Sequence, residues 1–198
     1  MGPDPLPRTF FQRPHLVVAR SLLGNLVVHG DCVGRIVEVE SYAARGDAAC
    51  HTAARPSSRA FLDSHPAGTA YVYLNYGMHW MLNVVAKDGR RDGLILIRAL
   101  EPLAGLAAMA ARRHRADPTA LCSGPGKLAQ AFALDGRHHG TDLTTPGGLF
   151  LAAGAPERLR ITRGPRIGIR LAVEKPWRFH LPGNPHVSKG GPAAPKGR

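Results

Sequence analysis

The sequence predicts an α+β fold, a single domain with a curved, barrel-like open antiparallel sheet flanked by helices. Strand-like runs follow one another with only short Gly- or Asn-containing turns between them, which favours antiparallel neighbours. Few helical patterns separate these runs, so a doubly wound parallel sheet is disfavoured. A chain of 198 residues without repeats or a dividing linker fits one domain, 1–198, with an ordered core over about 10–188.

The first third of the chain predicts one helix, two strands and a long loop. Residues 1–10 are rich in proline, and we expect them to be loose. An apolar stripe after Pro14 predicts a helix that ends at Gly24. Strands are expected at 26–29 and 33–42, with a turn at Gly30-Asp31 between them. The polar segment 43–69 is interpreted as a long loop, and loops of that length are usually functional or disordered.

The middle of the chain predicts a hairpin and two helices. The run YVYLNYGMHWMLNVV (71–85) has two β-rich halves around Asn75-Tyr76-Gly77, which is typical of a hairpin. Pro102 is expected to begin an Ala-rich helix through about Arg113. The string SGPGK (123–127) precedes a shorter helix that ends near Asp135-Gly136.

Further strands are expected wherever β-branched and aromatic residues gather between turns. These runs are 94–100, a short one near 149–152 within the turn-rich segment 137–165, 166–173 and 177–181. The tail from Pro182 is rich in Gly, Pro and Lys, and we expect it to fray.

Composition restricts the partners and the compartment. The formal net charge is +12, which favours a polyanionic partner such as nucleic acid, although a compositional bias toward arginine would give the same charge. The three cysteines are scattered and form no C-x-x-C, which predicts a reducing compartment and no zinc site. With no membrane-length apolar run and no secretion signal, we expect a cytoplasmic protein, nucleoid-associated if the source is bacterial.

Two carboxylates and a tyrosine stand out in the strand GRIVEVESY (34–42). Strand alternation places Glu38, Glu40 and Tyr42 on one face. A solvated strand face would explain the two glutamates, and so would a cleft in which one carboxylate acts as a general base. The strand alone does not decide between these alternatives.

Aromatic residues predict a stacking surface. Tyr76 at the hairpin tip could enter a duplex as a wedge or fold back onto the body. Tyr42, Tyr73 and His51 could form a pocket for a nucleic acid base. SGPGK offers either an anion site at Lys127 or a simple helix cap by Ser123.

Seven strings in order carry a resemblance to a known family. They are VARSLLGN (18–25), GRIVEVESY (34–42), DAACH (47–51), YVYLNYGMHWMLNVV (71–85), LIRALEPLAGLAAM (96–109), LCSGPGKLAQAF (121–132) and RIGI (166–169). The chain resembles the alkyladenine (3-methyladenine) DNA glycosylase family over about 16–188. It departs from the family pattern at 54–68, where the family's T-x-R-N segment is missing, and this puts the DNA contacts of the 52–70 region in doubt.

The resemblance implies a catalytic group and its supports. Glu40 matches the general base that activates water for attack on the anomeric carbon. Arg98 and the backbone carbonyl of Ile167 match the groups that hold this water. Glu38 matches a structural neighbour on the strand.

It also implies a base pocket and a DNA surface. Tyr42, His51 and Tyr73 match the walls that sandwich a flipped base, and Asn83 matches the residue that clashes with the exocyclic amine of guanine. At the DNA surface, Tyr76 matches the intercalating residue, and Met78 and Lys127 are placed there as further DNA contacts.

The function implied by the resemblance is monofunctional hydrolytic excision of alkylated or deaminated purines from duplex DNA. The lesions are 3-methyladenine, 7-methylguanine, hypoxanthine and 1,N6-ethenoadenine, and the product is an abasic site. No cofactor, metal, membrane or obligate protein partner is expected, and the protein is expected to act as a monomer. The alternatives are a basic nucleic-acid-binding module without catalytic activity and a carrier whose cleft binds a small molecule.

Overall fold

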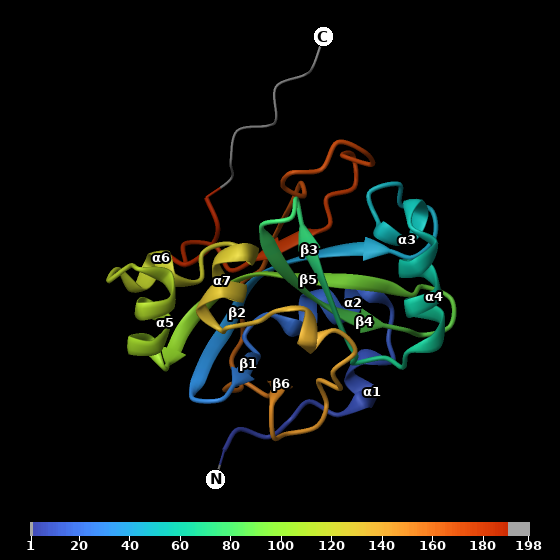
Figure 1. Ribbon diagram of the computed structural model, residues 1–198. Coiled ribbons are helices and arrows are strands. Elements are labelled where there is room, and N and C mark those ends of the chain that lie inside the picture. The colour runs from blue at the N-terminus through green and yellow to red at the C-terminus, as the bar shows by residue number, and fades with distance from the viewer. Residues whose placement is uncertain (1, 190–198) are drawn as a thin grey trace.

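The computed structural model describes residues 2–189 (Figure 1). The strands are β1 Leu26–His29, β2 Cys32–Ala43, β3 Ala70–Asn75, β4 His79–Ala86, β5 Gly93–Ala104, β6 Leu149–Ala152, β7 Thr162–Gly164 and β8 Arg178–His180. The helices are α1 Arg8–Phe11, α2 His15–Leu22, α3 His51–Ala54, α4 Pro56–Ser64, α5 Leu106–Arg113, α6 Pro118–Leu121, α7 Pro125–Ala131 and a 3₁₀ turn at Gly136–His138. None of the helices in this range is long and apolar enough to cross a membrane.

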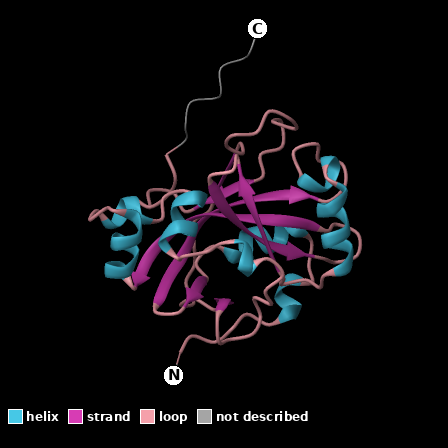
Figure 2. Ribbon diagram, in the orientation of Figure 1, coloured by secondary structure: helices cyan, strands magenta, loops and turns pink. Residues whose placement is uncertain are grey.

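All the strand pairs are antiparallel and belong to one curled sheet, which confirms the predicted α+β architecture. The strand order is β3-β4-β5-β2-β1-β6, and β7 and β8 lie off this path. β2 pairs with β5 along one edge, and with β1 and then β8 along the other. Seen in Figure 2, the strands lie between α5 and α6 at one margin of the molecule and α3 and α4 at the opposite margin. β2 is therefore held on both sides along most of its length.

Two irregularities in the β2–β5 ladder lie beside Glu38. Ile36 is opposite Leu100, but Glu38 is opposite Ala99, and the original register returns at Val39. The register shifts leave Arg98 without a paired residue on β2, next to the strand position of Glu38. Bulges of this kind re-aim side chains and are common beside active sites.

Apolar residues from the sheet and from helices α1, α2, α5, α6 and α7 form the main core. β2 and β5 are buried along nearly their whole length because apolar groups cover both sheet faces. On α2, Val18, Ala19 and Leu22 are completely buried, which satisfies the apolar stripe predicted there. Residues Leu128 and Ala129 of α7 join the same core.

Several sequence predictions are confirmed. These are the helix before Gly24, the strands either side of Gly30-Asp31, the hairpin around 75–77, and the strands near 149–152 and 177–181. The Ala-rich helix exists but begins at Leu106 rather than Pro102. Pro102 instead belongs to β5, where it faces Gly34 at a register shift, a place that tolerates the missing N–H.

Three predicted irregular regions are wrong. The segment 43–69 contains α3 and α4, whose few apolar residues gave little periodic signal. The N-terminus is not loose beyond residue 4, because the Leu6 N–H donates to the Leu151 carbonyl and α1 follows. The tail does not fray over 182–189, since the Ser188 N–H donates to Glu38 Oε2 at 2.8 Å. The remainder of the predicted tail, 190–198, lies outside the described residues.

One predicted strand does not exist. Residues 166–173 alternate apolar and other side chains, but they form neither strand nor helix. The first Ile of this segment donates its N–H to a buried carboxylate instead of to a neighbouring strand. This departure places the segment at the candidate site.

Candidate active site

A cavity of about 770 Å³ opens between the β3–β4 hairpin, β5, the start of α3 and the segment 167–169. Its size is typical of sites for small organic groups. It is lined by Tyr42, Ala49, Cys50, His51, Arg55, Tyr71, Tyr73, Asn75, Tyr76, Met81, Asn83, Leu94, Leu96, Arg98, Pro125, Ile167, Gly168 and Ile169. The structure thus brings together all the predicted pocket residues, although they are spread over more than 120 positions of sequence.

Glu40 lies directly behind the wall of this cavity. Its side chain is completely buried, and its carboxylate is held by hydrogen bonds. The Ile167 N–H donates to Oε1 at 2.6 Å, and the Tyr42 hydroxyl donates to Oε2 at 2.7 Å. A carboxylate has about four lone-pair positions, so these donors leave room for another, such as a water molecule.

Arg98 joins the two carboxylates of β2. Its Nη1 lies 3.2 Å from Glu40 Oε1, and its Nε lies 3.3 Å from Glu38 Oε1, which is an ion-pair distance without hydrogen-bond geometry. Glu38 is also completely buried and accepts from Arg178 Nε at 2.5 Å. Neither glutamate belongs to a solvated strand face, so that alternative is excluded.

Aromatic rings form one side of the cavity. The ring centroids of His51 and Tyr73 are 4.2 Å apart, and those of Tyr71 and Tyr73 are 5.7 Å apart. Burial, with the nearby Glu40 as the second cause, holds the pKa of Tyr42 well above its usual value, and burial raises the pKa of Tyr73 to about 12. Both hydroxyls are therefore protonated and able to donate at neutral pH.

His51 is a neutral member of the pocket. Burial, reinforced by the Arg55 guanidinium, lowers its pKa from 6.5 to about 4. Its Nδ1 lies 3.1 Å from the Tyr71 hydroxyl, which in turn lies 2.7 Å from Ser58 Oγ. A neutral imidazole offers one donor and one acceptor, so it can bind the edge or the face of a heterocycle without adding charge.

Asn83 lies on β4 and has its amide nitrogen engaged. Its Nδ2 donates to the Tyr71 carbonyl at 3.1 Å. The side chain is 4% exposed, yet it lines the cavity. This bond fixes the orientation of the side-chain amide, and a fixed polar group can discriminate between ligand edges.

The hairpin tip presents two apolar side chains to solvent. Tyr76 is 82% exposed and Met78 is 70% exposed, so the tyrosine does not fold back onto the body. The Met78 N–H donates to the Asn75 carbonyl at 3.0 Å, and φ is +50° at Tyr76 and +68° at Gly77. Positive φ at both central residues defines the tight turn that suits a two-stranded hairpin.

Lys127 lies on the exposed face of α7. Its Nζ is 3.4 Å from Ser123 Oγ. Gly124, rather than Ser123, occupies the cap position, and it contributes no side-chain cap, so the interpretation of SGPGK as a serine cap is wrong.

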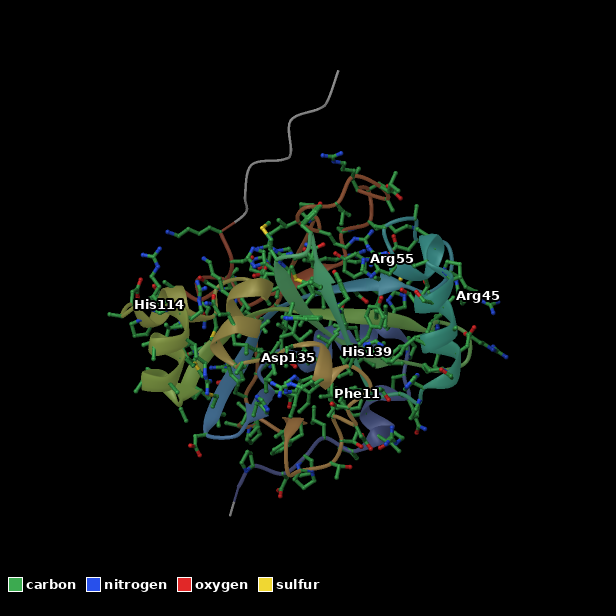
Figure 3. The ribbon with its side chains drawn as sticks, viewed as in Figure 1. Phe11, Arg45, Arg55, His114, Asp135 and His139 are labelled. Carbon is green, nitrogen blue, oxygen red and sulfur yellow. The ribbon has the colours of Figure 1, made fainter. Side chains whose placement is uncertain are left out.

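Some residues of the site were not predicted from the sequence. Tyr71 is among the cavity-lining residues that the sequence did not single out, and Arg55 lies in the segment expected to be irregular. Arg55 lines the cavity from the junction of α3 and α4, whereas Arg45 points outward at the right-hand edge of the molecule (Figure 3). Within residues 2–189, no three His, Cys, Asp or Glu side chains gather in a way that could hold a metal ion.

A family model described as methylpurine-DNA glycosylase (MPG) matches residues 9–185 of the chain. The chain belongs to the methylpurine-DNA glycosylase family. It is a DNA-3-methyladenine glycosylase, an N-glycosyl hydrolase of DNA repair, and DNA is its substrate.

Proteins named as 3-methyladenine DNA glycosylases in several bacteria are similar to this glycosylase over almost their whole length. The protein of Rhodopseudomonas palustris (strain BisB18) is 45% identical over 190 residues, which cover 96% of this chain and 92% of the relative. The protein of Salinibacter ruber is 42% identical over 209 residues, covering 98% and 100%. That of Frankia casuarinae is 41% identical over 198 residues, covering 94% and 92%.

Proposed function

We propose that this glycosylase flips a damaged purine out of duplex DNA and hydrolyses its N-glycosidic bond with Glu40 as the general base. The single observation that carries the proposal is the buried Glu40 carboxylate, which is fixed by two hydrogen bonds directly behind an aromatic cavity of about 770 Å³. A base inside a duplex is out of reach, so it must leave the stack at a cost of a few kcal/mol.

The reaction needs one water molecule. Glu40 takes a proton from the water while the water oxygen bonds to the anomeric carbon. The bond from that carbon to the purine nitrogen breaks. The bond electrons leave with the purine, and the DNA retains an abasic site. Arg98 and the Ile167 carbonyl hold the water, and Glu38 supports Arg98 from behind.

The pocket selects bases through stacking and through one polar contact. Tyr42, His51 and Tyr73 sandwich the extruded base, and a purine that carries positive charge stacks well against electron-rich rings. The same positive charge makes the purine a better leaving group. The fixed amide of Asn83 clashes with the exocyclic amine of guanine. Suitable lesions are 3-methyladenine, hypoxanthine and 1,N6-ethenoadenine, which lack that amine, and 7-methylguanine, which keeps it but whose positive charge favours both stacking and departure.

The DNA itself is held outside the pocket. Tyr76 enters the duplex from the minor groove and fills the space left by the flipped nucleotide, with Met78 beside it. Lys127 contacts a phosphate. No lysine lines the cavity among the described residues, which supports a monofunctional hydrolysis without a Schiff-base step. The protein acts as a monomer and needs no protein partner.

Substitution of Glu40 tests this mechanism. Glu40→Gln should slow single-turnover release of hypoxanthine from duplex DNA by about 10²–10⁴-fold, the usual contribution of a general base. Binding to the same duplex should hardly change, because stacking and phosphate contacts survive. Full activity of the variant would refute the assignment and make Glu38 the next candidate. Excision of the four lesions in parallel measures their ranking.

A further inference from the structure

A buried ion pair lies behind the proposed catalytic carboxylate. Arg166 Nη1 donates to Asp47 Oδ2 at 2.6 Å, and Arg166 Nη2 donates to Asp47 Oδ1 at 2.9 Å. Both side chains have no exposed surface, and neither lines the cavity. Because neither side chain reaches the cavity, the pair cannot contact a substrate bound there. Folding nevertheless has to remove both of its charges from water.

Stability alone does not account for such a pair. The cost of desolvating two buried charges can match or exceed their attraction. Two well-packed apolar side chains in the same place therefore often stabilise a protein at least as much as the ion pair does. The forked geometry of arginine, in contrast, can hold several acceptors in fixed positions at once. In this protein the fork of Arg166 connects backbone segments that are far apart in the sequence.

The pair ties three segments together. Arg166 also donates to the Ser41 carbonyl at the end of β2 and to the Ala172 carbonyl, both at 3.1 Å. Asp47 accepts from the Ala43 and Ala49 N–H groups at 3.2 Å, and so shapes the turn that leads to His51. The segment around Arg166 has neither helical nor strand bonds to fix it, so side chains must do so.

Arg166 lies next to both hydrogen-bond donors of the Glu40 carboxylate. Ile167 follows it directly in the chain, and the Ile167 N–H is the donor to Oε1. The Arg166 guanidinium carbon lies 4.6 Å from the centre of the Tyr42 ring, whose hydroxyl is the donor to Oε2. The guanidinium also lies 5.4 Å from the centre of the Trp177 ring, so it contacts two aromatic side chains.

We propose that Arg166, held by Asp47, is a positioning residue that orients the Glu40 carboxylate to take a proton from the attacking water. It acts through the Ile167 N–H and through the Tyr42 ring, and it makes no contact with the lesion. The inference rests on the proposed role of Glu40 as general base.

The test compares Arg166→Lys and Asp47→Asn with the parent enzyme. Both variants should slow single-turnover release of hypoxanthine by about 10–100-fold, because small misplacements of a catalytic group cost that much. The Kd for the same duplex should stay within about 3-fold, a difference of well under 1 kcal/mol. The acidic limb of the pH–rate profile should move to higher pH, since an ionised carboxylate has lost a fixed donor.

A matched control separates positioning from general stability. Arg8 also forks between an aspartate, Asp142, and a backbone carbonyl, and it too links distant segments, but neither residue lines the cavity and both side chains are partly exposed. Arg8→Lys and Asp142→Asn should leave the rate of excision unchanged. A folded Arg166→Lys variant with the parent rate would overturn the proposal.

Two further variants decide the remaining outcomes. If the single substitutions prevent folding, Asp47→Leu combined with Arg166→Met removes both charges together and leaves no lone buried charge. That double variant should still lose rate, and a parent-like rate would overturn the inference. Adding Arg166→Lys to Glu40→Gln should cause no further loss if Arg166 acts through Glu40, and an additional loss would contradict this route.

The outcomes also separate this inference from the proposed function. An active Glu40→Gln variant refutes the general base itself, whatever the Arg166 variants do. An inactive Glu40→Gln variant beside a fully active Arg166→Lys variant refutes only the positioning role.

Discussion

Removal of the Tyr42 hydroxyl isolates one hydrogen bond to the Glu40 carboxylate. Tyr42→Phe deletes the donor that lies 2.7 Å from Oε2, and it keeps the ring that packs against Arg166. Because the hydroxyl is protonated at neutral pH, the variant removes a donor and not a charge. The carboxylate keeps the Ile167 N–H on its other oxygen.

The magnitude follows from the type of bond. A hydrogen bond to a charged group contributes about 1.5–3 kcal/mol. If the transition state loses all of this, excision slows by about 10–150-fold. Affinity for lesion DNA should change by less than about 3-fold, since the stacking surface is intact. The free energy of unfolding should fall by about 1–3 kcal/mol, because a buried carboxylate keeps one partner fewer.

The assay is single-turnover release of hypoxanthine from duplex DNA with enzyme in excess, together with the Kd for the same duplex. Tyr73→Phe is the comparison, because among the described residues the Tyr73 hydroxyl makes no hydrogen bond to another protein group. Its loss of rate should be clearly smaller than that of Tyr42→Phe. Equal losses in the two variants would refute the reasoning, since the bond to Glu40 would then have no special role.

Three further results are expected. Tyr76→Ala should weaken lesion-specific binding and flipping by about 5–150-fold, the worth of one base–aromatic stack, and should leave excision from single-stranded DNA almost unchanged; equal effects on both substrates would rule out a wedge. The +12 charge should make log Kd rise with log salt by about 0.9 per phosphate contact, whereas a flat titration would mean that the charge is compositional. Burial lowers the pKa of His15 from 6.5 to about 4, so its stabilising effect is complete above about pH 6.5 and is lost as pH falls toward 4. His15 alone should remove about 2 kcal/mol from the free energy of unfolding between pH 7 and pH 5, and His51, whose pKa is also lowered to about 4, adds to that loss. Urea unfolding at the two pH values measures the total, and His15→Gln should remove the His15 share.

The sheet was predictable because its strands carry a strong local signal. The hairpin at 75–77 and the turn at Gly30-Asp31 each combine β-rich runs with a glycine that tolerates positive φ, Gly77 and Gly30 respectively. The helices α3 and α4 were missed because their few apolar residues and small size give little periodicity. The local sequence pattern therefore predicted strands that pair with the next strand along the chain. It failed for short helices that pack against parts of the protein distant in sequence.

The segment 166–173 shows why alternation can mislead. Ile167, Ile169 and Leu171 alternate as in a strand, but the backbone there is engaged by side chains, with Glu40 accepting from Ile167 and Arg166 donating to Ala172. Contacts such as the one between Ile167 and Glu40 join positions more than 120 residues apart in sequence. No local pattern can encode them.

The candidate site was predictable where a resemblance supplied residues, and incomplete where tertiary contacts decide. Glu40, Tyr42 and His51 were expected and do lie around one cavity. Asp47 and Arg166 stood inside two of the matched strings, DAACH and RIGI, but nothing in those strings indicates that they pair. Their pairing follows only from the curl of the sheet, which brings the 166–172 segment over the end of β2.

The left-handed backbone conformation of Tyr76 lowers the stability of the protein, while the tyrosine ring at this position is proposed to serve its activity. A residue other than glycine in that conformation costs about 1–2 kcal/mol, while Asn and Gly accept it readily. Selection for thermal resistance alone would therefore favour Tyr76→Gly or Tyr76→Asn. Either change would relax the turn and delete the ring proposed to fill the duplex. A library screened only for melting temperature should thus lose its repair activity first at this position, and engineered stabilisation of the protein should hold Tyr76 fixed.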